Sequence, residues 1–262
     1  MSHSPSALSE PAIVSALRAA GCVFAEDEAR LLLAAEASPA ELEGMVARRV
    51  AGFPLEHILG WAEFCGLRIA VGPGVFVPRR RTEFLVQQAA ALAPPGAVAL
   101  DLCCGSGALG AALMAAVDGL DLYAADIEPA AVAYARRNLD PGRVFEGDLF
   151  DPLPASLAGR IDILLCNTPY VPTDKIETMP PEARLHEPRV TLDGGPDGLA
   201  VQRRVAALAP RWLAPGGHLL VEASESQAPL TAEIFGSAGL IPRIASSEEL
   251  DATVVIGTRP SP

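Results

Sequence analysis

Four consecutive residues near the middle of the chain combine a side-chain amide, a proline and a phenol: Asn167, Thr168, Pro169 and Tyr170. They follow residues 161–166, an apolar run typical of a buried strand. One interpretation is a plain turn, because Asn and Pro are common in turns. The other is a site for a planar amino group, with the Asn167 side-chain oxygen and the Thr168 carbonyl accepting its two N–H bonds and Tyr170 stacked on its plane. The position at the end of a strand favours the site.

A glycine-rich segment forms the second candidate site. Gly105, Gly107 and Gly110 have the spacing G-x-G-x-x-G, and Asp126 follows Gly105 by 126 − 105 = 21 residues. This spacing is typical of dinucleotide-binding loops, in which glycines let the backbone approach the ligand and the acid binds ribose hydroxyls. A nicotinamide-dependent oxidoreductase is therefore one hypothesis, although it leaves residues 167–170 unexplained.

The same segment resembles the S-adenosylmethionine loop of class I methyltransferases, because Asp101 stands four residues before Gly105. The resemblance implies that Asp101 and Asp126 bind the ammonium group and the ribose diol of the cofactor. It places Asp148 at the adenine amino group with Leu149 against the ring, whereas Asp148 alone would be interpreted as a cap or turn residue. The expected cofactor-binding residues are Asp101, Cys103, Cys104, Gly105, Ser106, Gly107, Asp126, Ile127, Asp148, Leu149 and Asn167.

The tetrapeptide at 167–170 resembles the N-P-P-Y motif of methyltransferases that modify a planar amino nitrogen. The resemblance implies in-line methyl transfer that is dominated by positioning and needs no strong general base before attack. The expected catalytic residues, which are also expected to bind the substrate, are Asn167, Thr168, Pro169 and Tyr170.

Most of the chain resembles the HemK/PrmC family, whose members methylate the glutamine side-chain nitrogen of peptide-chain release factors. The resemblance implies that a helical N-terminal module helps to bind a protein substrate, that the remainder binds S-adenosylmethionine, and that Glu187 contacts the substrate. The matching segments are 49–60 (RVAGFPLEHILG), 64–67 (FCGL), 75–79 (VFVPR), 82–83 (TE), 187–188 (EP) and 194–199 (GGPDGL).

Three sites depart from the family pattern. Cys103-Cys104 replace a Gly-Thr pair, and we expect both thiols to pack as small hydrophobic groups. Arg80-Arg81 replace a proline and an acid, and Thr168 replaces the first proline of the motif. These changes leave the acceptor open. The other hypotheses are an N-methyltransferase acting on adenine or a small molecule, and a non-catalytic binding protein that kept the fold.

The composition argues against several classes of function. The 262 residues carry a formal net charge of −12, which disfavours non-specific binding to DNA or anionic membranes. The one basic run, Arg79–Arg81, is expected to be a solvated face. Five cysteines without CxxC spacing and four scattered histidines indicate neither disulfides nor a metal site. The polar segment 1–11 lacks a signal-peptide core, and we expect a soluble, cytoplasmic, monomeric protein.

The elements that must position these residues follow from hydrophobic spacing. Residues 1–60 have helical periodicity and predict an N-terminal helical substrate-binding module, with a capping box at Ser38 and Glu41. Residues 61–80 predict a hairpin linker that turns at 72–74 and returns over 75–77. The helices of the N-terminal module are expected at 8–20, 25–35 and 39–51.

Residues 81–262 alternate helices with strands and predict the S-adenosylmethionine-binding methyltransferase domain. This alternation is typical of an α/β fold with a doubly wound, mostly parallel, Rossmann-like sheet. The last strands are expected to run antiparallel at an edge, and 171–197 is expected to be a long loop. Strands are expected at 98–102, 121–125, near 144, 161–166, 218–222 and 253–257, and helices at 82–92, 108–117, 129–139, 199–213 and 227–238.

Overall fold

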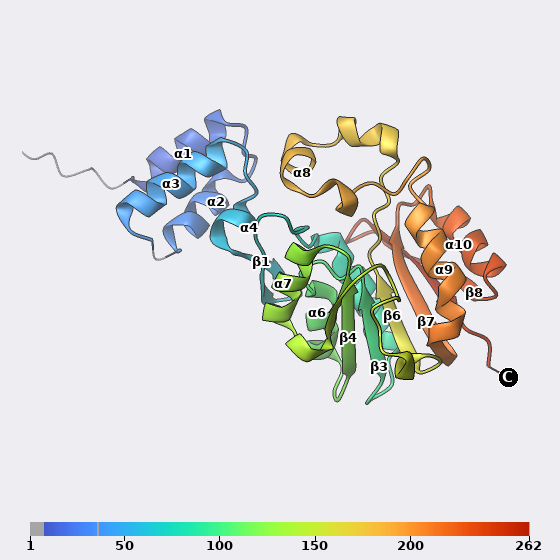
Figure 1. Cartoon of the computed structure of the whole chain (residues 1–262). Helices are drawn as coiled ribbons and strands as arrows, with labels where there is room; N and C mark the ends of the chain where they lie inside the picture. Colours follow the sequence, from blue (N-terminus) through green and yellow to red (C-terminus); the bar gives the residue numbers. More distant parts are fainter. Residues whose placement is uncertain (1–7, 36, 262) are drawn as a thin grey trace, which may run out of the picture.

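The computed structural model describes residues 8–35 and 37–261, and within them the N-terminal part is a bundle of short helices (Figure 1). Helix α3 begins at the capping box predicted from Ser38 and Glu41, which satisfies two backbone N–H groups at once. The apolar faces of the helices meet in a core of their own, which includes Ile13, Leu17 and Leu32. Most of the polar segment 1–11 lies outside the described residues. The helices are α1 (Glu10–Ala19), α2 (Ala25–Leu33), α3 (Pro39–Val50) and α4 (Leu55–Leu59).

A β-hairpin follows the bundle, and it is shorter than the sequence predicted. Strands β1 (Trp61–Phe64) and β2 (Leu67–Ala70) pair antiparallel, with Phe64 opposite Leu67. The turn is Cys65-Gly66, whose φ angles of 50° and 74° are the two positive values that a type I′ hairpin turn requires. The chain does turn where predicted, since the backbone N–H of Val75 donates to the Gly72 carbonyl at 3.2 Å, but this is not the hairpin turn and the predicted return strand at 75–77 is wrong. Phe64 is fully buried in the core of the main sheet, so the hairpin is part of that core.

The described residues after the hairpin are built on one seven-stranded sheet in the order β5-β4-β3-β6-β7-β9-β8. Strands β5, β4, β3, β6 and β7 are parallel, whereas β9 is antiparallel to both of its neighbours. The doubly wound, mostly parallel fold and its antiparallel edge are thus confirmed; the edge strand β8 was not predicted. The strands are β3 (Val98–Leu102), β4 (Asp121–Asp126), β5 (Val144–Glu146), β6 (Ile161–Cys166), β7 (Leu213–Ala223), β8 (Ile241–Ser247) and β9 (Ala252–Thr258).

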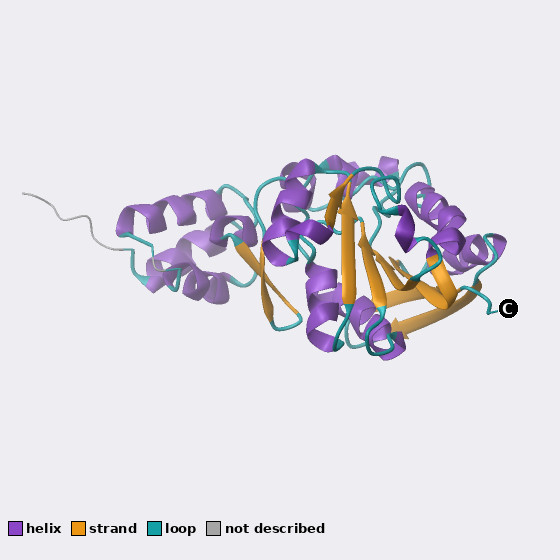
Figure 2. Cartoon of the chain, turned by 60° about the horizontal axis from the view of Figure 1, so that its bottom comes forward, coloured by secondary structure: helices purple, strands orange, loops and turns teal. Residues whose placement is uncertain are grey.

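Helices cover both faces of this sheet (Figure 2). On one face α5 and α6 pack on Ala99 and Ile163, with α7 beside them, and on the other face α9 and α10 pack on Leu100 and Leu164. Successive strand residues point to opposite faces, so β6, which is apolar except at Asp162, is buried on both sides. The helices are α5 (Glu83–Leu92), α6 (Ala108–Ala116), α7 (Pro129–Asn138), α9 (Ala200–Trp212) and α10 (Ala228–Ser237).

Residues 171–197, which we call the strap, contain more structure than the predicted loop. The strap holds helix α8 (Pro181–His186) and two 3₁₀ turns, and it lies between the N-terminal bundle and the sheet domain (Figure 1). Arg49 of α3 donates to Glu182 of the strap at 3.3 Å and to Glu28 of α2 at 2.6 Å. The ring centroids of Phe53 and His186 lie 4.4 Å apart. These contacts join the bundle to the strap.

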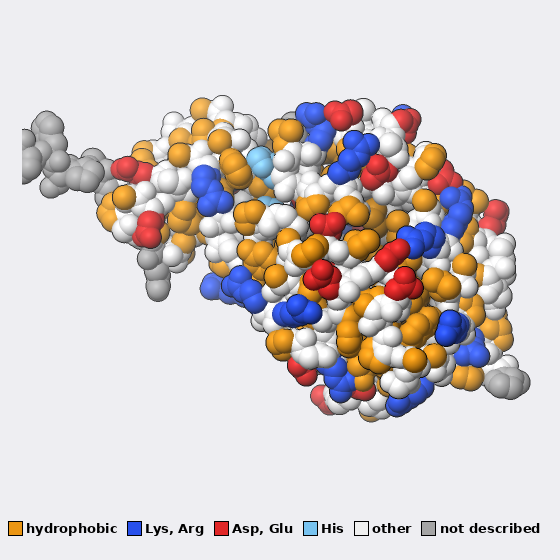
Figure 3. All heavy atoms as spheres, in the orientation of Figure 1, with side chains coloured by type: hydrophobic (Ala, Val, Ile, Leu, Met, Phe, Trp, Pro, Cys, Tyr) orange, Lys and Arg blue, Asp and Glu red, His pale blue; other side chains and the backbone are white. Residues whose placement is uncertain are grey.

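The surface of the molecule is chemically mixed. On the face drawn in Figure 3, Lys and Arg side chains are scattered among acidic and hydrophobic ones. Within residues 8–35 and 37–261, no helix has the length and apolar character needed to cross a bilayer, and no group of three His, Cys, Asp or Glu side chains is arranged around a common metal position. The five cysteines are free thiols.

Candidate functional site

A cavity opens at the carboxyl ends of β3, β4 and β6, where the strand order reverses direction and where open α/β sheets bind their ligands. It contains about 1310 Å³ of space not filled by protein, part of which is open solvent. Asp101 and Gly107 do not line this cavity. The predicted site residues that do are Cys103, Cys104, Gly105, Ser106, Asp126, Ile127, Asp148, Leu149, Asn167, Thr168, Pro169, Tyr170 and Glu187.

Positive φ angles shape the loop between β3 and α6. Gly107 has a φ of 76°, and a Cβ there would lie 2.8 Å from Leu139 Cδ1, so glycine allows the close approach of Leu139 at the end of α7. Gly105 has a φ of 54° with nothing within 4 Å of its Cβ position. Cys103 also has a positive φ, 57°, which costs a residue with a side chain roughly 1–2 kcal/mol. The loop therefore holds backbone strain at a residue that lines the cavity.

Asp126, at the end of β4, ties this loop to the neighbouring strand. One carboxylate oxygen accepts the backbone N–H of Gly105 at 2.8 Å, and the other accepts that of Glu128 at 2.9 Å. Burial raises the pKa of Asp126, and the backbone donors act in the opposite direction. Each oxygen keeps a further lone pair, so the carboxylate has acceptor capacity left for hydroxyl groups of a ligand.

Asp101 lies behind the loop and not in the cavity wall. It is 1% exposed, and one of its oxygens accepts the backbone N–H of Gly110 in α6 at 2.8 Å. A Cβ on Gly110 would lie 3.2 Å from that oxygen, so glycine lets the helix approach the carboxyl group. Burial raises the pKa of Asp101 to about 8. Asp101 thus braces the first turn of α6, and its direct contact with a cofactor ammonium group stays a prediction.

Asp148 and Leu149 follow β5 and line the cavity beside Arg204 of α9. Arg204 pairs with Asp148 at 2.6 Å, so an adenine amino group would compete with this arginine for the carboxylate. Leu149 is buried with a φ of 50°, and Ile127 is half-exposed at the rim. Sequence analysis did not single out Arg204, because nothing in the pattern distinguishes it from the surface arginines around it.

Residues 167–170 follow β6 and form the wall of the cavity beside the glycine-rich loop. Asn167 is half-buried and lines the cavity, and its side-chain amide makes no hydrogen bond with any described residue, so it is available to a ligand. Thr168 is 2% exposed, and its hydroxyl has no partner among the described residues. The tetrapeptide therefore lines the cavity, with the Asn167 amide available to a ligand and the Thr168 hydroxyl buried in the wall.

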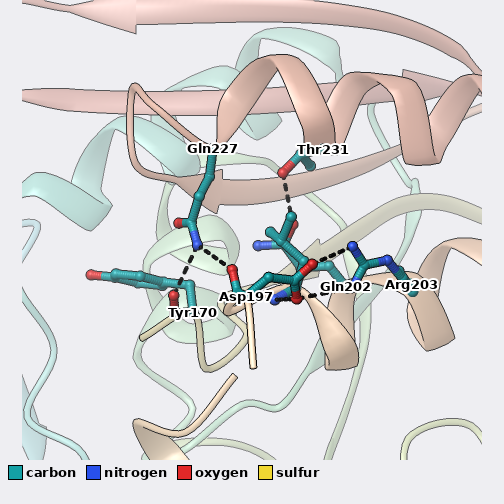
Figure 4. A network of polar contacts seen from close by, with 7 residues as sticks. Tyr170, Asp197, Gln202, Arg203, Gln227 and Thr231 are labelled. Atoms are coloured by element: carbon teal, nitrogen blue, oxygen red, sulfur yellow. Dashed lines mark hydrogen bonds and ion pairs between the residues drawn. The ribbon is translucent and has the colours of Figure 1, made fainter. Parts of the chain in front are cut away.

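Gln227, the residue before α10, fixes the backbone of this loop (Figure 4). Its Nε2 donates to the carbonyl oxygens of Tyr170 at 3.1 Å and Asp197 at 3.2 Å. A Cβ on Gly198 would lie 2.2 Å from the Tyr170 carbonyl oxygen, so the segment around Gly198 lies this close only because it has glycine there. Sequence analysis missed Gln227, because it belongs to a different element that meets the loop only in the folded chain.

The basic run at 79–81 is only in part the solvated face that the sequence predicted, because Arg80 and Arg81 are exposed but Arg79 and Arg81 pair with buried carboxylates. Arg79 forms an ion pair with Glu187 at 2.5 Å, and Glu187 also accepts the backbone N–H of Val77 at 3.3 Å. Burial raises the pKa of Glu187, and Arg79 opposes that effect. Glu187 lines the cavity, and it holds the strap against the segment that leads into α5.

Arg81 makes the second ion pair of this run with a buried carboxylate. Its Nε donates to Glu222 near the end of β7 at 3.2 Å, and its Nη2 contacts the Tyr170 hydroxyl. Glu222 is 4% exposed and was not predicted as a site residue. Arg81 and Glu222 are 141 positions apart, so no local pattern connects them.

Known proteins similar to this chain agree on methyl transfer. Residues 66–195 match the family model described as the methyltransferase small domain. The chain is 39% identical to the release factor glutamine methyltransferase of Geobacter sulfurreducens, covering 85% of this chain and 80% of that protein. It is 38% identical to that of Mycolicibacterium smegmatis, over 86% and 82%. A Pyrococcus furiosus methyltransferase structure shares the fold, with a TM-score of 0.57, 17% identity and coverage of 74% of this chain and 90% of that chain.

Proposed function

This chain belongs to the family of release factor glutamine methyltransferases, and from that premise we propose that it transfers a methyl group from S-adenosylmethionine to the side-chain amide nitrogen of a glutamine in a release factor. One observation carries the proposal for the site itself. The side-chain amide of Asn167, which has no hydrogen-bond partner among the described residues, lines the same cavity as the glycine-rich loop that is hydrogen-bonded to Asp126. An acceptor amide at Asn167 and a cofactor on that loop would therefore be neighbours.

The cavity offers hydrogen-bond acceptors and an apolar surface that suit the cofactor. Asp126 has lone pairs left for the ribose hydroxyls, and the open space over Gly105 admits a ligand close to the backbone. Leu149 supplies an apolar surface for the adenine ring. Asp148 would bind the adenine amino group after giving up its ion pair with Arg204. Bound S-adenosylmethionine supplies a methyl group on a sulfonium sulfur, which departs as a neutral thioether.

The acceptor amide needs to be oriented more than deprotonated. Its nitrogen lone pair is delocalised, so accepting both N–H bonds turns the lone pair toward the methyl carbon. We assign one acceptor to the Asn167 side-chain oxygen and the other to the Thr168 carbonyl, which Pro169 keeps in an extended backbone. Tyr170 stacks on the amide plane. The nitrogen loses one proton to solvent after the new N–C bond forms.

We assign binding of the protein substrate to the N-terminal helices and the strap. Val23 and Phe24, between α1 and α2, are 84% and 68% exposed, which is high for large apolar side chains. Arg49 links the bundle to the strap through Glu182, and the strap carries Glu187 to the cavity. A protein held by the bundle would thus be connected to the acceptor end of the site.

Methyl transfer to a purified release factor tests the proposal. The protein is incubated with S-adenosylmethionine carrying a labelled methyl group and the release factor, and the labelled residue is mapped by peptide mass spectrometry. The expected result is label on one glutamine side chain. Label on adenine in added DNA or RNA instead, or no transfer while NAD binds and S-adenosylhomocysteine does not, would contradict the proposal.

A further inference from the structure

Arg81 occupies a bridging position between two elements of the candidate site. It lies in the 3₁₀ turn Arg80–Thr82 before α5, lines the cavity, and contacts both the Tyr170 hydroxyl and the Glu222 carboxylate. Its guanidinium carbon also lies 5.8 Å from the centroid of the Tyr170 ring. A planar fork of donors can hold two acceptors at once, which a lysine ammonium does less well.

Glu222 makes this contact more than a surface ion pair. The carboxylate side chain is 5% exposed, and one of its oxygens has no hydrogen-bond partner among the described residues. A buried carboxylate is costly without a compensating cation, and Arg81 is the cation that it contacts. Glu222 therefore restrains the guanidinium from the protein side, and the guanidinium reaches outward to the phenol.

Tyr170 is then held at two points. Gln227 fixes its carbonyl oxygen, and the phenol ring extends away from that contact (Figure 4). Arg81 meets the far end of the ring at the hydroxyl. Without this second contact the ring could rotate about its side-chain bonds, because Gln227 restrains only the backbone.

We propose that Arg81 is a positioning residue: braced by Glu222, it fixes the Tyr170 ring in the orientation that lies against the planar acceptor group. The role of this orientation in holding the acceptor rests on the proposed function. The restraint of the Tyr170 ring by Arg81 is a property of the protein without substrate. Arg81 takes no part in the bond-making step and acts through Tyr170.

The restraint can be measured without any turnover. The chain has three tyrosines, so protein labelled with fluorotyrosine gives few fluorine resonances, and loss of one in a Tyr170→Phe variant assigns that of Tyr170. Arg81→Met should shift the Tyr170 resonance and raise the pH at which it titrates, because Arg81 lowers the pKa of Tyr170 while burial and Glu222 raise it. Arg80→Met is the matched control, since Arg80 makes no hydrogen bond or ion pair with a described residue; its Tyr170 resonance should stay in place.

Measurements of kcat give a second, independent test of the proposal. Arg81→Met should lower kcat about tenfold, the scale of one half-exposed charge-assisted contact, with S-adenosylhomocysteine affinity unchanged within twofold. Arg81→Lys should recover part of that loss. In a Tyr170→Phe background, where the hydroxyl is gone, Arg81→Met should change kcat less than twofold.

The outcomes separate the inference from the proposed function. An unmoved Tyr170 resonance in Arg81→Met, or the same tenfold loss of kcat in the Tyr170→Phe background, overturns the inference. A shifted resonance in a protein whose wild type methylates no release factor overturns the proposed function and leaves the restraint of Tyr170 by Arg81 standing.

Discussion

The backbone N–H of Gly105 donates to the carboxylate of Asp126 across 2.8 Å, joining the loop after β3 to the end of β4. The two residues are 21 positions apart, and the parallel pairing of β3 with β4 brings them together. The carboxylate that is expected to bind the cofactor ribose thus also holds the loop over which the cofactor is expected to lie. Loss of Asp126 should weaken both functions together.

Asp126→Ala should therefore weaken binding of S-adenosylhomocysteine by roughly 1–3 kcal/mol, the cost of a lost charge-assisted partner. Isothermal titration calorimetry measures this directly. Asp121→Ala is the matched control, because Asp121 begins the same strand at its opposite end and pairs with Arg143. Equal affinities of Asp126→Ala and wild type would remove Asp126 from the cofactor site.

The positive φ of Cys103 predicts that glycine is more stabilising than alanine at this position, the opposite of the usual order. Cys103→Gly should be more stable than Cys103→Ala by roughly 0.5–1 kcal/mol, because alanine keeps the left-handed strain and glycine does not. At Cys104, whose φ is not positive, the order should be reversed. Urea denaturation of the four variants measures the differences. The same order at both positions would show that the Cys103 backbone is not strained.

Asp101 predicts a pH-dependent term in stability. Its folded-state pKa of about 8 lies above the unfolded value of about 3.9, so the folded state keeps a proton that the unfolded state loses. The stabilisation is complete below pH 4 and is lost as the pH rises to 8, by up to about 1.4 kcal/mol per pH unit. The unfolding free energy of wild type should therefore fall relative to that of Asp101→Asn between pH 5 and pH 8. A constant difference would mean that Asp101 is ionised in the folded protein throughout.

The N-terminal bundle is expected to contribute to binding of the protein substrate. Phe24→Ala should raise KM for the release factor about tenfold, as loss of one apolar anchor does, with S-adenosylhomocysteine affinity unchanged. Ile241→Ala is the control, because Ile241 is also exposed, at 61%, but lies on the edge strand β8 at the far end of the molecule (Figure 1). Equal KM values for Phe24→Ala and wild type would exclude this part of the bundle from the interface.

Much of the sheet could be predicted from the sequence because its central strands are buried on both faces. The bounds of β6 are those predicted, since Ile161–Cys166 is apolar at nearly every position. Strand β8 carried no such signal, as Ile241 and Ile244 are 61% and 43% exposed. The hairpin turn was misplaced because Gly72-Pro73-Gly74 is a stronger turn pattern than Cys65-Gly66, and a cysteine with positive φ is uncommon.

The site was predicted where its residues are neighbours in sequence or lie at the ends of adjacent strands. The glycine-rich loop and residues 167–170 belong to that group, and both line one cavity. Arg81, Glu222 and Gln227 do not, because their roles depend on contacts between segments far apart in the chain. A run of three arginines resembles a solvated face until the buried acids opposite it are known.

Replacement of Asn167 tests the central assignment most directly. Asn167→Ala should lower kcat for a release factor roughly 10²–10³-fold, because one acceptor that orients the amide is lost, and should leave S-adenosylhomocysteine affinity nearly intact. Thr168→Pro, which leaves the Thr168 carbonyl in place and restrains Asn167, should be tolerated or raise kcat. Single-turnover methyl transfer with the mapped glutamine as readout gives both rates. If Asn167→Ala transfers methyl groups at the wild-type rate, residues 167–170 are only a turn and the assignment of the acceptor site is wrong.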